Sequence, residues 1–593
     1  MRLDILIPLL ALPVLPFVWP EPRPIEPLAP ERELATLSPT DSTVYVEAPG
    51  LADLARRGLE HPLARAVLAE PRVQALLAAG KTDPKSLLAG LDAVAGFEVL
   101  PTVAKLSERG AALSLAFRGA KPSALLVLRG ADAQAFGDEV EELLALAAER
   151  AGFAGAFDQP MDRVLGADLW RVGEELSIAR RDAVAFVSND EAFLRDALEL
   201  AASADAKGLA GSADFAAAAK ARTPNELVFA FADLGELDQR AEKGRLGDPE
   251  GWKKLRNMAR EPGVQFLLGP TFAVLGGARS ASLSIACERE DVRLSLVGHG
   301  VDCGAAGALL PEADAAFPPA PNGRANVATW VLHRDLADLF AKRADLFEPE
   351  QLPAFSEALS NLAIFFGGVD ISETVIPSLA PWGRVVVRDI EFDAASKPEL
   401  PFPAAALIVR VQDPTQVGPL FPSAFQTVVG LMNVERGQQG KPPMQLQLEL
   451  VGDVQVSYAK LMPPKPGEGV DVVYNLEPAC ALRGEVFVIG THRKMVEELV
   501  KELAAGKLDA RAPTAERLEI AGEAVLSALV ANREALVMNA VLSEGKTREK
   551  AERDLDGVLA IAELVEHVEL EARRLDAESF ALELAIDVAA PKE

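Results

Sequence analysis

The sequence contains few of the residues that cross-link proteins or catalyse reactions. Only three of its 593 residues are cysteine, five are histidine, and aromatic residues make up 6% of the chain. The cysteines, Cys287, Cys303 and Cys480, form no C-x-x-C pair, so no disulfide framework is indicated. A hairpin turn predicted at 288–291 places Cys287 opposite Val292 and away from Cys303. We therefore expect buried or unpaired thiols.

The histidines do not occur at metal-ligand spacing. No H-E-x-x-H pattern is present and no G-x-S-x-G motif marks a nucleophilic serine; the histidines are His61, His299, His333, His492 and His567. Asp389, Glu391 and Asp393 alternate along a predicted strand and are the best candidates for a calcium site, although such residues are also typical of a solvated strand end.

These shortages lead to a prediction of no catalytic residue, no metal and no cofactor. The alternative is a hydrolase whose catalytic residues are scattered along the chain, because the members of a catalytic triad meet only in three dimensions.

Two G-K-T triplets resemble the end of a phosphate-binding loop. Such a loop also requires a glycine five residues before the glycine of the triplet, so that backbone N–H groups can surround the phosphate. Ala75 and Ala540 occupy that position ahead of 80–82 and 545–547. We therefore interpret both triplets as structural, with Gly80 ending a helix.

Positive charge is also scarce. The chain has 60 Lys and Arg against 88 Asp and Glu, which gives a net charge of -28 at pH 7. A field of this sign repels the phosphate backbone of nucleic acids and anionic lipid headgroups. No nucleic-acid partner is expected, and the acidic excess mainly favours solubility.

Long apolar runs are absent apart from one at the N-terminus. Residues 5–19 follow Arg2 and are shorter than the roughly 20 residues of a spanning helix, as in the hydrophobic part of a signal peptide. Five prolines between residues 20 and 30 then predict a stiff tether. No A-x-A cleavage site follows the run. The side chains predicted to contact the membrane are Ile5, Leu6, Leu9, Leu10, Leu15, Phe17, Val18 and Trp19.

This segment predicts an exported protein of the periplasm or cell envelope, either cleaved or anchored by an uncleaved N-terminus. The alternative is a cytoplasmic protein whose N-terminus is a hydrophobic arm.

Five segments recur in the same order, displaced by roughly 280 to 300 residues. The pairs are 41–57 with 328–343, 122–132 with 403–413, 183–202 with 485–505, 227–237 with 525–536, and 282–297 with 568–586. Preserved order favours a duplication. We predict a signal or anchor segment with a Pro-rich tether at 1–40, a first half at 41–305, a linker at 306–325 and a second half at 326–593.

Hydrophobic periodicity predicts strands and helices in both halves. Alternation over Phe580–Val588 predicts a strand with one buried face, paired in a hairpin through a turn at 575–579. A helix at 544–565 is predicted from its Glu, Lys, Arg and Leu content. Another helix carries one apolar stripe, formed by Met495, Val496, Leu499, Val500 and Leu503. The fold predicted is α+β, with two tandem related halves, each an antiparallel sheet with packed helices.

In the clearest repeated pair, 41–57 with 328–343, the shared residues are apolar and of the kind that packs in a core. Tyr45, in the short predicted strand Val44–Val46, aligns with Trp330, and a helix is predicted to follow in both copies. Asp335 is predicted to cap the second of these helices, and Asp233 and Asn532 occupy comparable strand-to-helix junctions. We interpret the repeat as duplicated architecture and not as a duplicated active site.

The segment Leu37–Leu77 carries a Pro and an Asp before a short aromatic strand, then a P-x-L-A-x-L helix. It continues with His61-Pro62-Leu63 and Pro71-Arg72-Val73, and a strand with D-L-x-x-L follows at Phe229–Leu237. In these features it resembles a domain-of-unknown-function family of large exported proteins from planctomycete-type bacteria. The resemblance implies export and an α+β repeat, and it supplies no catalytic residues.

Together these features predict an exported or membrane-anchored envelope protein that acts as a non-catalytic binding or scaffolding module. Paired halves can enclose a groove, and the apolar content would suit a lipid or peptide ligand. The sequence does not choose among a lipid, a peptide and a protein as the ligand.

Overall fold

The structure is a computed structural model that describes residues 33–50, 57–58, 61–69, 105–119, 121–150, 160–172, 176–223, 225–246, 248–260, 276–288, 290–301, 320–321, 326–347, 349–392, 397–398, 400–461, 473–505, 508–509, 516–576 and 578–589. The predicted anchor residues, Gly80, Asp393 and Cys303 lie outside the described residues. The chain divides into two compact units, 1–256 with 278–300 and 257–277 with 301–593. Helices and antiparallel strands occur in both, which confirms the α+β class.

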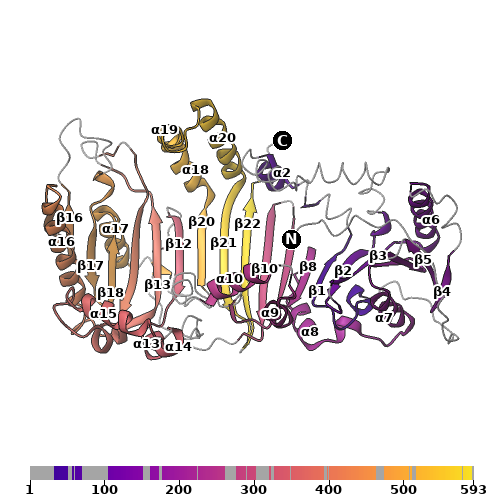
Figure 1. The fold of residues 1–593 in the computed structure, drawn as a ribbon. Helices are drawn as coiled ribbons and strands as arrows, with labels where there is room; N and C mark the ends of the chain where they lie inside the picture. The colour runs from indigo at the N-terminus through magenta and orange to yellow at the C-terminus, as the bar shows by residue number, and fades with distance from the viewer. Residues whose placement is uncertain are drawn as a thin grey trace. The chain divides into compact units, whose positions relative to one another are not determined.

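The first unit is built on ten antiparallel strands among its described residues (Figure 1). Their order is β10–β9–β8–β1–β2–β3–β7–β6–β5–β4. The bounds are β1 Val44–Ala48, β2 Gly110–Ala116, β3 Ser123–Arg129, β4 Asp162–Val164, β5 Ala167–Val172, β6 Leu176–Arg181, β7 Val184–Ser188, β8 Glu226–Asp233, β9 Ser280–Cys287 and β10 Asp291–His299.

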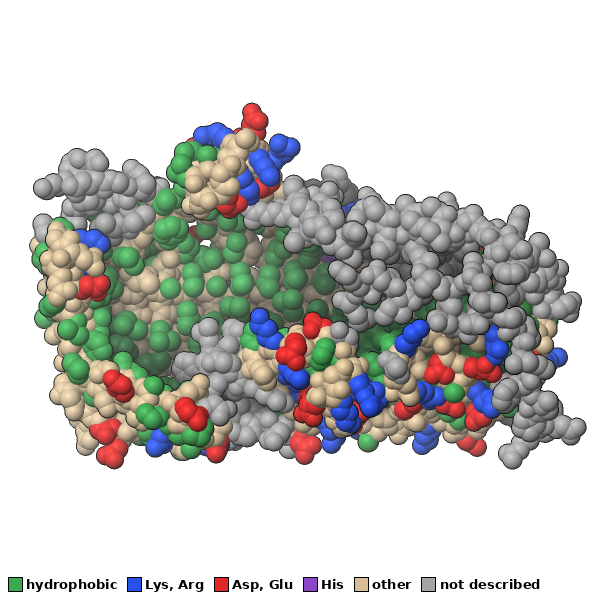
Figure 2. Space-filling view, in the orientation of Figure 1, with side chains coloured by type: hydrophobic (Ala, Val, Ile, Leu, Met, Phe, Trp, Pro, Cys, Tyr) green, Lys and Arg blue, Asp and Glu red, His purple; other side chains and the backbone are tan. Residues whose placement is uncertain are grey.

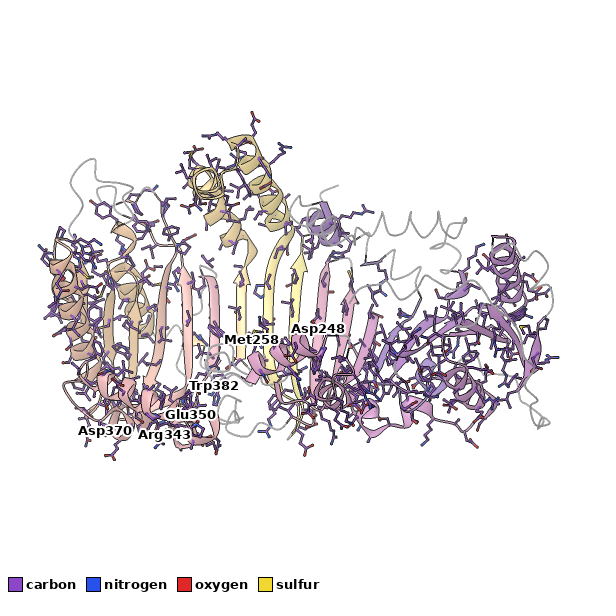
Figure 3. The ribbon with its side chains drawn as sticks, viewed as in Figure 1. Asp248, Met258, Arg343, Glu350, Asp370 and Trp382 are labelled. Atoms are coloured by element: carbon purple, nitrogen blue, oxygen red, sulfur yellow. The ribbon has the colours of Figure 1, made fainter. Side chains whose placement is uncertain are left out.

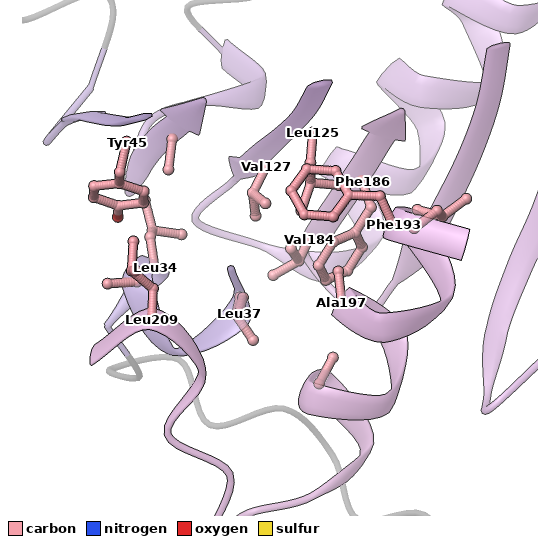
Figure 4. Close-up of a cluster of buried hydrophobic side chains, with 14 of the residues drawn as sticks. Leu34, Leu37, Tyr45, Leu125, Val127, Val184, Phe186, Phe193, Ala197 and Leu209 are labelled. Atoms are coloured by element: carbon pink, nitrogen blue, oxygen red, sulfur yellow. The ribbon is translucent and has the colours of Figure 1, made fainter. Parts of the chain in front are cut away.

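Helices cover both faces of this sheet. On one face, η1 (Leu34–Leu37), α7 (Glu191–Ala202), η3 (Gly208–Gly211) and α8 (Ala213–Ala219) pack on Tyr45, Leu125 and Phe186 (Figure 4). On the other face, α6 (Ala133–Arg150) packs on Leu128 and Trp170. The remaining helices are α2 (Pro62–Ala69), α9 (Leu234–Glu242) and α10 (Pro249–Arg260). Because η1 supplies buried leucines to this core, the folded unit already includes residues of the segment predicted as tether.

The second unit also has a sheet of ten antiparallel strands among its described residues. Their order is β22–β21–β20–β12–β13–β14–β18–β17–β16–β15. The bounds are β12 Asn326–His333, β13 Leu379–Arg388, β14 Ala404–Val411, β15 Gln445–Val451, β16 Val454–Lys460, β17 Ala479–Arg483, β18 Val486–Gly490, β20 Glu516–Ala521, β21 Val565–Arg574 and β22 Phe580–Val588. The short strands β11 (Ala320–Pro321) and β19 (Leu508–Asp509) pair separately.

Two helices cover opposite faces of one end of this sheet. The helix α17 (Arg493–Ala504) packs on Val386, Ile408 and Val488, and α16 (Leu420–Gln438) packs on Cys480 and Phe487 on the other face. The other elements are α13 (Leu336–Ala341), α14 (Arg343–Leu346), α15 (Leu352–Ala363), η5 (Ile371–Val375), η6 (Ile376–Ser378), η8 (Val473–Asn475), α18 (Gly522–Ala531), α19 (Arg533–Glu544) and α20 (Arg548–Leu564).

The strand orders of the two units match position by position, with β1, β2 and β3 corresponding to β12, β13 and β14, and β8 to β20. In the described residues, four of the five recurring segment pairs fall on corresponding elements, while the helix predicted after β1, at 51–56, lies outside the described residues. The pair 227–237 with 525–536 is wrong, because the first lies in β8 and α9 while the second lies in α18 and α19.

The alignment of Tyr45 with Trp330 is also displaced. Tyr45 packs in the core beneath α7, in the cross-strand row that contains Leu125. Trp330 pairs with Val385, whose row continues to Leu407 on the face opposite to α17. The register of β12 shifts near Asn326, and a slip of one residue moves a side chain to the other face of a sheet.

Several local predictions are confirmed. The stripe of α17 is buried, with Met495, Val496 and Leu499 all at 0% exposure. Asp335 caps α13 through the backbone N–H of Asp338, and Asp233 caps α9. The turn after β21 is closed by a bond from Leu575 N to Ser579 O.

Two other local predictions differ from the structure. Asn532 does not cap a helix with its side chain, because its amide donates to Ala528 O and Pro401 O at the junction of α18 and α19. The predicted helix at 544–565 begins at Arg548, because Gly545 adopts a left-handed conformation at the end of α19 and Thr547 caps α20.

Candidate apolar binding face

The residues that could have carried chemistry have structural partners. The Nδ1 atoms of His61 and His492 accept hydrogen bonds from the backbone N–H groups of Leu63 and Lys494, as helix caps do. His333 packs edge-on against Trp382, with ring centroids 4.9 Å apart. Ser123 donates to Asp190, but that carboxylate caps α7. Each of these contacts therefore has a structural explanation.

The second G-K-T triplet connects two helices. Gly545 ends α19, Thr547 caps α20, and the Lys546 Nζ lies 2.7 Å from the Asp554 carboxylate. In the described part of the chain, no group of three or more His, Cys, Asp or Glu could hold a metal ion. The predicted acidic strand is wrong in its extent, because β13 ends at Arg388 before Asp389 and Glu391.

The two described cysteines are buried free thiols, as expected. Cys287 pairs with Val292 across the hairpin of β9 and β10, as the sequence predicted. Its Sγ donates to Arg57 O at 3.3 Å, and burial raises the pKa of its thiol. Burial alone raises the pKa of Cys480 to about 12.

The first unit contains a small polar cavity of about 270 Å³. Asp41 on its wall pairs with Arg118 at 2.7 Å, and Glu236 pairs with Arg240 at the same distance. Asp233 in the same wall caps α9. Since each of these three carboxylates is already in an ion pair or caps a helix, none of them is left available to bind a ligand.

The second unit has a broader feature, an apolar row that crosses six strands. Leu407, Val385, Trp330, Leu518, Leu570 and Leu584 are successive cross-strand partners from β14 to β22. The next row on the same face contains Val387, Ile520, Val568 and Ile586. We define these ten side chains as the apolar face. They occur on one face because alternate residues of a strand point the same way.

This apolar face is only partly covered. Leu407 is 38% exposed, and the other nine side chains are half-buried. Figure 2 shows apolar side chains gathered over β12, β13 and β20–β22, below the helices α18–α20 and above α13–α15. The strand predicted at Phe580–Val588 is confirmed, and its predicted buried face is buried at Phe580 and Val588 but only half-buried at Leu582, Leu584 and Ile586.

The opposite face of the same strands is charged. Arg517 lies 2.9 Å from Glu569 and 2.8 Å from Glu571, and Arg573 lies 2.5 Å from Glu583. An antiparallel sheet usually places its charged face in water and its apolar face against a core. Here the charged face is in the expected place, whereas the apolar face retains accessible surface.

One end of the apolar face is fixed by a buried ion pair. Glu516 at the start of β20 pairs with Arg334 and accepts a hydrogen bond from His333 N at 2.9 Å. Burial raises the pKa of Glu516, and the charge of Arg334 opposes that rise. Trp382 lies at this end of the sheet (Figure 3). The pair locks β12 to β20 at the point where β12 leads into α13.

The helices beside the apolar face also expose apolar side chains. Val530 is 54% exposed and Leu542 is 78% exposed on α18 and α19. Within the described residues, no single helix combines the length and apolarity needed to cross a membrane, while α18 and α19 meet that criterion only as a pair bent by 66°.

Comparisons with known proteins identify no family. No family model matches the chain, and no curated protein matches it. Two crystal forms of TP0453, I and III, align with 47% and 45% of this chain and with 80% of their own length. Identity is 10% in both, and the TM-scores are 0.23 and 0.22. Scores this low do not establish a shared fold.

Sequence reasoning missed the apolar face as a site. The alternating pattern of each strand was visible, but the pattern does not show whether a helix packs on the apolar side. The one usable signal was Trp330, an aromatic residue at a repeated position whose neighbours Val331 and Thr329 face the other way.

Proposed function

We propose that this protein is a non-catalytic binding module for an apolar chain, such as the acyl chain of a lipid. The observation that carries the proposal is the accessible apolar face of the second unit. Partial exposure of ten large apolar side chains in register costs free energy that an apolar ligand would recover, at about 25 cal/mol per Å² covered.

The position of the apolar face favours an acyl chain over a peptide. Its inner strands β12, β13, β20 and β21 each pair on both sides, so their backbone groups are already bonded. A peptide laid across this face would bury its own N–H and C=O groups without partners, which is unfavourable. A hydrocarbon chain has no such groups.

The setting proposed for this module is the cell envelope. The apolar run at 5–19 and the proline-rich segment after it support export, with either cleavage or retention as an anchor. We further propose that the two units arose by duplication, which the matching strand orders and the four corresponding segment pairs support. The resemblance of Leu37–Leu77 to an exported family is consistent with this setting.

Trp330 allows a direct test. A long-chain fatty acid carrying a spin label or bromine should quench Trp330 fluorescence on binding, because that indole lies on the apolar face, whereas Trp170 and Trp382 are buried at 2% and 1% exposure. Titration of wild-type protein and of Trp330→Phe separates this signal from the other tryptophans. We expect saturable quenching in the wild type and clearly weaker quenching in the variant, which retains Trp19 and the half-buried Trp252.

A matched pair of variants tests the location. Leu570→Asn places an amide on the apolar face, and Glu571→Asn places the same amide on the charged face of the same strand. The first should weaken binding by roughly tenfold or more, since it removes apolar contact and adds a polar group to be desolvated, and the second should not. Equal effects, or equal quenching in wild type and Trp330→Phe, would contradict the proposal.

A further inference from the structure

The strand β15 forms an edge of the second unit's sheet. It pairs with β16 along Gln445–Val451, and no other described strand of its unit pairs with its outer side. Edge strands present unpaired N–H and C=O groups that can template pairing with another chain, so they are usually short, charged or covered. β15 is not short, since it has seven residues, its one charged residue is Glu449, and it is exposed along most of its length.

Three leucines make this edge apolar. Leu446, Leu448 and Leu450 alternate along β15 and are 42%, 57% and 72% exposed. Leu446 pairs with Ala459, which lies in the cluster beneath α16, so the leucines share the face that α16 covers. The polar residues of β15 point the other way, and one of them, Glu449, pairs with Arg493 at 2.6 Å.

The helix α16 extends this apolar surface. Its outer side exposes Val428 (39%), Leu431 (47%), Met432 (45%) and Val434 (59%). The helix is tied to the segment entering β15, because the Asn433 side chain donates to Met444 O at 2.9 Å and accepts from Met444 N at 2.6 Å. Strand edge and helix side therefore form one continuous surface that combines unpaired backbone groups with apolar side chains.

The equivalent edge of the first unit is different. There the last strand in the same order is β4, which has only three residues, and Asp162 and Arg163 are exposed. That edge has the short, charged form expected of a strand protected from pairing. Since the two units share their strand order, the apolar edge of β15 is a property of the second unit alone.

We propose that β15 is a self-association surface that pairs antiparallel with β15 of a second copy of this chain. The strand's midpoint is Leu448, and a two-fold axis there aligns all seven residues. Leu448 then faces Leu448 of the second copy, Leu446 faces Leu450 of the second copy, and Gln447 faces Glu449 of the second copy. This register places leucine on leucine and sets no like charges opposite each other, and it continues the sheet across the axis.

This complementarity favours a second copy over an unrelated peptide as the occupant. The α16 helices of the two copies would flank the joined strands on the same face, so their exposed apolar side chains are covered in the same step. The surface lies on β15 and α16, which contribute no side chain to the apolar face, and the inference does not depend on the proposed ligand.

The test uses the full chain, released from mild detergent for native mass spectrometry and measured in parallel by sedimentation. At about 100 µM, where an interface of useful affinity is saturated, the wild type should give a species of two 63.0-kDa chains. The variant Leu448→Lys sets two ammonium groups against each other at the axis and should weaken association by about tenfold or more.

Two further variants make the result specific. Leu542→Lys changes a leucine on α19 that is more exposed than Leu448 (78% against 57%) and far from β15 in the sequence, and it should leave association unchanged. A mixture of Leu448→Lys with Leu448→Glu should recover a mixed dimer, because opposite charges then meet at the axis. Circular dichroism checks that each variant is folded. A monomeric wild type, a dimer untouched by Leu448→Lys, or a mixture that fails to pair would overturn the proposal.

Discussion

Cys480 shows how burial limits what a single reactive residue can do. It lies in β17 with 0% exposure, packed in the cluster beneath α16. Burial disfavours the thiolate and raises the pKa of this thiol from 9.0 to about 12. Because the thiolate is the nucleophile and the metal ligand, the side chain at this position acts as a small apolar group.

The raised pKa has a consequence for stability at alkaline pH. The neutral thiol is favoured in the folded state, so its contribution to the free energy of unfolding is complete below pH 9.0 and is lost as the pH rises toward about 12. From about pH 8 to about pH 11, wild type should therefore lose more stability than Cys480→Ala. Denaturant unfolding of both proteins across this range measures the difference, and parallel curves would refute it.

At the residue scale, helix caps were predictable where a short acidic side chain lies at the junction of a strand and a helix. Asp233 is the last residue of β8 and Asp335 lies two residues after the end of β12, and each accepts a hydrogen bond from the backbone N–H three residues later. The capping prediction for Asn532 is wrong because this residue lies between two helices, where its side-chain amide donates a hydrogen bond to the carbonyl oxygen of Ala528, four residues earlier in the chain. Sequence alone does not distinguish these settings, since both place a short polar residue beside apolar ones.

The helix α17 is the element whose role followed most directly from sequence. Its apolar residues recur at helical spacing, and all five are buried against the sheet. Substitution of Leu499 by Ala should lower the free energy of unfolding by about 2–5 kcal/mol, because it removes buried methyl groups and leaves a cavity.

The matched control is Lys501→Ala on the exposed side of α17. It should change stability by no more than about 0.5 kcal/mol, as is usual for surface substitutions. Chemical denaturation monitored by circular dichroism gives both values. Similar losses in the two variants would show that α17 is held by something other than its apolar stripe.

The mistaken segment pair at 525–536 illustrates the limit at the element scale. An Ala, Val and Leu sequence of this kind has no clear periodicity, so it was matched to the strand β8 although it forms α18 and α19. What fixes the helix start is local: a Cβ on Gly522 would lie 1.7 Å from Val565 O. Only glycine allows that close approach between β20's end and β21, and the sequence does not reveal the contact.

At the scale of the whole molecule, the sequence predicted the order of the strands and helices better than it predicted which sheet faces and edges the helices cover. Four recurring segment pairs fall on matching strands and helices of the two units. The open apolar face and the apolar edge of β15 were not predictable, because both depend on which helices pack where. The alternation in Gln445–Val451 is the same pattern that a strand with one face buried against a core would show.

The net charge of -28 leads to a prediction about association of whole chains. Two copies repel each other at long range, whereas the proposed β15 contact is apolar and hydrogen-bonded. Raising ionic strength from about 0.01 M to about 0.1 M shortens the screening length from about 30 Å to about 10 Å, which weakens the repulsion. The dimer dissociation constant of the wild type should therefore fall as salt increases.

The mixed dimer of Leu448→Lys and Leu448→Glu provides the control for this effect. Its ion pair at the two-fold axis is attractive and is screened by the same salt, so it should gain less affinity than the wild type over that range. Sedimentation at several salt concentrations measures both constants. An association held mainly by ion pairs between copies would instead weaken in salt, and that result would exclude an apolar contact at β15 as its main source of affinity.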